Sequence, residues 1–225
     1  MDKLYMILLC LMIVPILICI KYSRKIKSDV ASSIVKCLIF TIVTILSNGL
    51  SAFSGNETFS YIMEALYRFS FDLMLIYVLQ YSQQYTRVFH EVSPFKKGCF
   101  IIAYLDGILL FLNIIFHNVF TIETVRFPNF DMYHVADKSI IFYFHYVFAY
   151  GLVFCIIASF IIKIIQIPDF YRKKYLPILV LMCVITVSKF ICGILEFPID
   201  VSLPFFVCAA ILICYLTLYR SPREL

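Results

Sequence analysis

The sequence predicts an all-α integral membrane protein, a seven-transmembrane helix bundle that forms a single domain over residues 1–225. The chain is 63% hydrophobic and 15% charged, with a mean hydropathy of +0.95, which excludes an ordinary soluble domain. Its apolar runs are about 17 to 25 residues long, enough for a helix to cross about 30 Å of hydrocarbon. They lack the period of two that is typical of an outer-membrane barrel.

Positive charge in the loops indicates how the helices are oriented, because cytoplasmic loops are enriched in Lys and Arg. The loops after spans one, three and five, together with the C-terminal end, hold thirteen Lys and Arg residues, whereas the N-terminus and the other loops hold three. We therefore expect the N-terminus outside, the C-terminus in the cytoplasm, and a multi-pass protein of the cell membrane. The predicted spans are about 4–20, 31–52, 59–82, 99–118, 140–165, 175–197 and 203–219.

The first two spans are interpreted as membrane helices that remain in the mature chain. Positive charges follow the run at 4–20 instead of preceding it, and no small-x-small cleavage site is evident, which excludes a signal peptide. Asn48 lies near the outer end of the second span. It is a candidate ligand contact, with helix-to-helix hydrogen bonding as the alternative.

The third span carries an unusual line of charges. Glu64, Arg68 and Asp72 are spaced four apart and therefore share one helix face. Because charges are costly in lipid, this face should lie against other helices or a wet cavity. Arg68 is interpreted as an internal counter-ion for Glu64 and Asp72, with contact to an anionic ligand as the alternative.

The fourth span adds Asn113 in its outer half and His117 at its outer boundary. Asp106 shares a face with Asn113 but is expected in the inner half, away from the other polar residues. The outer segment 119–139 mixes aromatic and charged residues. It favours a small lid or a short amphipathic helix, with an ordinary connector as the alternative.

The last three spans contribute His145, Tyr150 and Lys189. An intramembrane histidine suggests a proton or ligand contact, with a structural histidine as the alternative. Lys189 lies too deep to reach the surface easily, so a carboxylate partner is expected, and Asp72 is the first candidate. The seventh span begins after Pro204, carries no charge and is expected to serve in packing.

Taken together, the polar residues gather in the outer half of the bundle, which favours a receptor cup over a through-going channel. The candidate ligand-binding or polar-core residues are Asn48, Glu64, Arg68, Asp72, Asn113, His117, His145, Tyr150 and Lys189. The common hydrolase and phosphate-loop motifs are absent from the sequence, so no enzyme activity, catalytic residue, metal site or cofactor is predicted. A basic, aromatic nucleic-acid-binding surface is not predicted either.

Several stretches resemble the seven-transmembrane sensor region at the N-terminus of bacterial histidine kinases and diguanylate cyclases. They are FSFDLMLIYVLQYS, LNIIFHNVF, FYFHYVFAYGLVF, YRKKYLPILVLM and FPIDVSLPFFVCAAILICYLTLYR. The resemblance covers nearly the whole chain in topology. The stretch ITVSKF around Lys189 departs from it, because it lacks the proline and asparagine usual in that family.

The resemblance implies signal transduction, as in two-component systems. An extracellular or membrane-derived ligand, a small molecule or a lipid-like signal, would shift the bundle and act on a cytoplasmic output domain. Because the sequence ends at Leu225, that kinase or cyclase is expected in a longer chain or in a separate partner. Membrane lipids and a second copy of the chain are the other expected partners. A small seven-span solute transporter is the alternative function.

Overall fold

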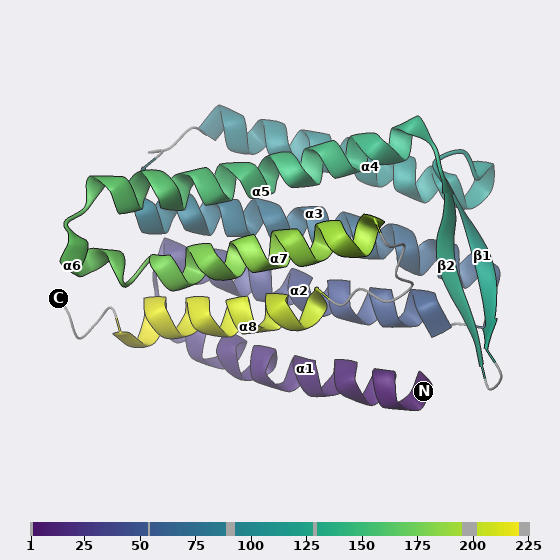
Figure 1. The fold of residues 1–225 in the computed structure, drawn as a ribbon, viewed down its shortest axis with the longest axis horizontal. Helices are drawn as coiled ribbons and strands as arrows, with labels where there is room; N and C mark the ends of the chain where they lie inside the picture. The colour runs from purple at the N-terminus through teal and green to yellow at the C-terminus, as the bar shows by residue number, and fades with distance from the viewer. Residues whose placement is uncertain (1, 54, 89–92, 128–129, 195–201, 221–225) are drawn as a thin grey trace.

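A computed structural model describes residues 2–53, 55–88, 93–127, 130–194 and 202–220, and most of them are helical. Seven helices coincide with the seven predicted apolar runs, and they lie side by side along one direction (Figure 1). The helices are α1 (Asp2–Ser23), α2 (Asp29–Phe53), α3 (Glu57–Thr86), α4 (Ser93–Phe116), α5 (Ile140–Gln166), α7 (Leu176–Ile194) and α8 (Leu203–Cys214).

Two shorter helical segments adjoin the long helices. The short helix α6 (Asp169–Arg172) connects α5 to α7, and the π-helical segment η1 (Tyr215–Arg220) continues α8. The sixth span was predicted to extend to about residue 197. Helix α7 ends at Ile194, and residues 195–201 lie outside the described residues.

Three helices have the length and composition needed to cross a membrane. Within the described residues these are Asp29–Phe53, Pro94–Phe116 and Ile140–Gln166. Many large apolar side chains on the bundle are exposed, including Ile115 on α4 and Val147 and Phe154 on α5, each at least 70% accessible. Several charged side chains within the helices are buried instead, namely Glu64, Arg68, Asp72 and Asp106, which is the distribution expected when lipid replaces water around a bundle.

Helix α3 is the centre of the bundle. It packs against α2, α4 and α5, and buried residues occur along its whole length. The helix starts where the Asn56 side chain accepts a hydrogen bond from the Phe59 N–H at 3.0 Å, and it ends at Arg87 in the left-handed conformation. The line of charges found in the sequence therefore lies on the most enclosed helix.

The segment after α4 forms a β-hairpin, so the fold is mainly helical as predicted but is not all-α. A short amphipathic helix, one of the alternatives for 119–139, was wrong. Strand β1 (Phe120–Phe127) pairs antiparallel with β2 (Phe130–Lys138), and the hairpin lies across one end of the bundle (Figure 1). In β1, buried Phe120 and Ile122 alternate with more exposed Thr121 and Glu123. This period of two, with β-branched residues, favours a strand over a helix.

Candidate functional site

A cavity of about 150 Å³ lies among the helices, and residues of the hairpin form part of its lining. Side chains from α2, α3, α5, α7, α8 and β2 line it. The structure thus brings together six of the nine residues predicted from the sequence. These are Asn48, Glu64, Arg68, His145, Tyr150 and Lys189.

Arg68 and Glu64 form a buried ion pair in the cavity wall. Arg68 Nη2 lies 2.5 Å from Glu64 Oε1, and the Ser51 hydroxyl donates to Glu64 Oε2 at 3.1 Å. The guanidinium also lies 4.2 Å from the centroid of the Phe142 ring, close enough for a cation–π contact. Arg68 Nε is buried without a hydrogen-bond partner, so this guanidinium has donor capacity that the protein does not use.

Lys189 of α7 also lines the cavity, and it does not pair with Asp72 as predicted. Its ammonium group donates to the Tyr67 hydroxyl and lies 4.8 Å from the centroid of the Phe71 ring. Asp72 instead faces His145 on α5. The prediction failed because depth alone does not specify which face of α3 turns toward α7, and Asp72 turns toward α4 and α5.

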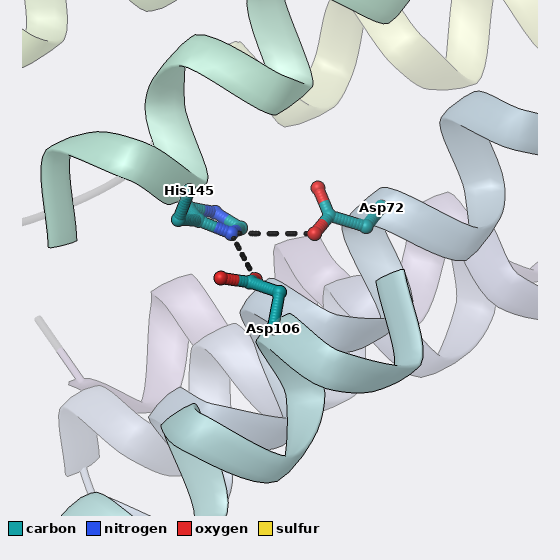
Figure 2. Close-up of side chains that lie close together, drawn as sticks. All are labelled: Asp72, Asp106 and His145. Atoms are coloured by element: carbon teal, nitrogen blue, oxygen red, sulfur yellow. Dashed lines mark hydrogen bonds and ion pairs between the residues drawn. The ribbon is translucent and has the colours of Figure 1, made fainter. Parts of the chain in front are cut away.

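Asp72, Asp106 and His145 form a second polar cluster, at the junction of α3, α4 and α5 (Figure 2). His145 Nδ1 lies 2.8 Å from Asp106 Oδ2 and 3.3 Å from Asp72 Oδ2. All three side chains are almost fully buried, with exposed fractions of 0% for Asp72, 2% for Asp106 and 3% for His145. Asp72 therefore has His145 as its partner, and Arg68 is the counter-ion of Glu64 alone.

The expectation that Asp106 lies apart from the other polar residues was also wrong. Helix α4 begins at Ser93 instead of about residue 99, so Asp106 lies near the middle of this helix. Asp72 lies near the middle of α3. The signal that could have identified the contact is this shared central position of two carboxylates on neighbouring helices.

Asn113 and His117 lie away from the cavity, where α4 meets the hairpin. The Asn113 side chain accepts from the Val119 N–H at 2.6 Å and donates to the Phe120 carbonyl at 2.8 Å. His117 has a positive φ of 50° and is exposed, and its ring contacts that of Tyr61, with the centroids 4.5 Å apart. Asn113 therefore holds the start of the hairpin on the bundle, and His117 lies beside Tyr61 of α3.

The sequence analysis missed the residues that the hairpin and α3 add to the cavity. Tyr133, His134, Val135 and Lys138 come from β2, and Tyr67 comes from α3. Recognising the strand by its alternating pattern could have placed the hairpin residues. No comparable signal separated Tyr67 from the other tyrosines of the chain.

The cavity is rich in cations. Among the described residues that line it, Arg68, Lys138 and Lys189 are basic, and Glu64 is the one acidic residue.

Comparison of the chain with models of protein families and with curated proteins finds no match. The cavity's own chemistry, basic and hydroxyl groups beside aromatic rings, suits an anionic group on a small ligand.

Proposed function

We propose that this chain is the sensor domain of a membrane signalling protein, and that it binds a small anionic molecule inside the bundle. The observation that carries the proposal is the cavity, which lies between the helices and the hairpin and is lined by Arg68, Lys189 and Lys138 together with Glu64. A carboxylate or phosphate group beside Arg68 would use the buried Nε–H that has no hydrogen-bond partner. The proposed activity is binding, without catalysis.

In this proposal all seven long helices span the membrane, with the N-terminus outside. The distribution of Lys and Arg among the loops supports this orientation, which puts the hairpin on the outer side. The cavity lies near the hairpin, so a ligand would reach it from outside or from the outer leaflet. The hairpin residues that line the cavity would then be the first groups that the ligand meets.

Helix α3 is the proposed path of the signal, because it contacts both the cavity and the opposite end of the bundle. Arg68 lies in the cavity wall, while Tyr81, more than three turns further along, forms a 2.9 Å hydrogen bond with Thr217 of η1. A ligand that favours one packing of α3 would thus shift the end of the chain that leads toward a cytoplasmic output domain. A histidine kinase or diguanylate cyclase, in the same chain or in a partner, is the proposed output.

Ligand binding can be tested with the purified protein in lipid nanodiscs. Thermal unfolding would be followed during titration with acetate, succinate, inorganic phosphate and glycerol 3-phosphate. We expect at least one of them to raise the unfolding midpoint in a saturable way, since ligands that bind the native state stabilise it. Arg68→Gln and Lys189→Met should each weaken binding at least tenfold. Lys163→Met, in the last turn of α5 and outside the cavity lining, is the matched control.

Two further outcomes separate the sensor from its competitors. Ligand binding should change the labelling rate of the buried Cys214 thiol at the far end of α8, measured residue by residue with mass spectrometry. Binding without any change there would contradict signal transmission. Uptake of the bound molecule into liposomes would instead support a small solute transporter. If none of the anions binds to folded protein, the proposal of an anionic ligand is wrong.

A further inference from the structure

We infer that Asp72, Asp106 and His145 bind a divalent transition-metal ion at the junction of α3, α4 and α5. The three residues come from three different helices, and their donor atoms all lie within 4.8 Å of one another. Figure 2 shows both carboxylates directed toward the same edge of the imidazole ring. This site adjoins the proposed anion site and shares His145 with it, but neither Asp72 nor Asp106 lines the cavity.

The spacing of the donor atoms already suits a metal ion. Carboxylate oxygen and imidazole nitrogen bind ions such as zinc at about 2.0 to 2.2 Å, which puts neighbouring donors about 3 to 3.5 Å apart. The distances from His145 Nδ1 are 2.8 Å to Asp106 and 3.3 Å to Asp72. Small side-chain rotations, without any movement of the helices, would therefore form a three-ligand site.

The hydrogen bonding of Asp72 is the second observation that points to a ligand. Its side chain is fully buried, and neither carboxylate oxygen makes a hydrogen bond. Its contact with His145 Nδ1, at 3.3 Å, is an ion pair only when the imidazole is protonated. The His145 Nδ1–H donates to Asp106, the nearer carboxylate. One N–H cannot fully satisfy two carboxylates, so Asp72 is left without this hydrogen bond. An unsatisfied carboxylate away from water is strongly disfavoured, and a cation shared by both carboxylates would remove this penalty.

Charge and donor type specify the class of ion. Two carboxylates and a neutral imidazole carry a charge of −2, which a divalent cation balances within an apolar bundle. An imidazole donor favours zinc, iron, copper or nickel over calcium and magnesium, which prefer an all-oxygen set, and the two carboxylates would also suit manganese. His145 also lines the cavity, so an ion could reach the site from that side.

Bound metal would connect this site to the cavity through α3. Asp72 lies one helical turn after Arg68, so an ion that holds Asp72 against α4 and α5 would also fix the helix that carries Arg68. Metal occupancy would therefore order one wall of the cavity. Protonation of one carboxylate would neutralise part of the negative charge without any metal. The experiment therefore has to distinguish a bound metal ion from a protonated carboxylate.

The experiment uses the purified chain in detergent micelles, stripped with a chelator and then titrated with Co²⁺, with Zn²⁺ and Mn²⁺ measured by equilibrium dialysis. We expect one ion per chain and the weak visible absorption of cobalt bound by oxygen and nitrogen. Asp72→Asn and Asp106→Asn should each weaken binding at least tenfold. Asp137→Asn, an exposed carboxylate on the hairpin, should bind like the unmodified protein.

The metal-free proteins provide a check on folding. Asp72→Asn removes a buried charge that has no hydrogen-bond partner, so its metal-free unfolding midpoint should equal or exceed that of the unmodified protein. Only the unmodified protein and the Asp137→Asn control should gain stability when metal is added. Less than a tenth of an equivalent of all three ions on folded protein would overturn the inference. Binding that survives both cluster variants, or that shows intense cobalt–thiolate bands, would assign the ion to cysteines and overturn it too.

Discussion

Replacing Gly107 by Ala should force α3 and α4 apart beside Asp106. A β-carbon at position 107 would lie 2.5 Å from Phe69 Cδ2 and 2.8 Å from Cε2. Carbon atoms in contact normally stay about 3.5 to 4.0 Å apart, so the ring or the helix must move by about 1 Å. The Phe69 ring contacts Tyr104 and Phe111 of α4, with centroids 5.8 Å and 6.3 Å away, and these contacts oppose its rotation away from position 107.

The size of the effect follows from two opposing terms. Overpacking of this kind costs about 1 to 3 kcal/mol. The change from Gly to Ala inside a helix stabilises the helix by up to about 1 kcal/mol, because Ala has the higher helix propensity. With the full helix gain, we therefore expect Gly107→Ala to destabilise the bundle by up to about 2 kcal/mol, which lowers the unfolding midpoint by up to a few degrees.

Gly151→Ala in α5 is the matched control. A β-carbon there would meet no atom within 4 Å, so only the favourable helix term remains and the midpoint should stay unchanged or rise. Both variants would be compared by thermal unfolding in detergent micelles, followed by circular dichroism. Equal stability of the two variants would show that α3 and α4 do not approach closely at Gly107.

Three further predictions concern the hairpin and the polar cluster. Tyr61→Phe removes the hydroxyl that accepts the buried Ile122 N–H at 3.0 Å, and should cost about 1 to 3 kcal/mol of unfolding free energy, measured by chemical denaturation. Asn113→Ala removes the bonds to the start of the hairpin and should increase hydrogen exchange of the hairpin amides at least tenfold, an effect that an independently held hairpin would not show. In double-mutant cycles on metal-free protein, Asp72→Asn with His145→Gln should show a coupling of at least about 0.5 kcal/mol. Asp72→Asn with Lys189→Met should be additive, and the opposite ranking would contradict the observed pairing.

The helices could be predicted from the sequence because long apolar runs are a strong and local signal. The Arg68–Glu64 pair could be predicted as well, since residues four apart on a helix are neighbours whatever surrounds them. The hairpin was missed because its alternating pattern covers two short strands and competes with an equally plausible amphipathic reading.

The cluster of Asp72, Asp106 and His145 could not be predicted from the sequence, for a different physical reason. Its members are more than 30 residues apart and meet only when the order, rotation and start of three helices are known. An error of six residues in the start of α4 was enough to place Asp106 at the wrong depth. Periodicity identifies which residues share a helix face, but it does not identify which helix that face meets.

The hairpin is held on the bundle through hydrogen bonds to its backbone, whereas side chains of its second strand line the cavity. Tyr61 and Asn113 hold it through backbone atoms of residues 119, 120 and 122, so these bonds do not depend on which side chains the second strand carries. The residues of β2 that line the cavity, including His134 and Lys138, can therefore be exchanged while those bonds persist. If the cavity binds a ligand as proposed, substitutions on this strand would alter selectivity while the helices beneath it keep the same packing.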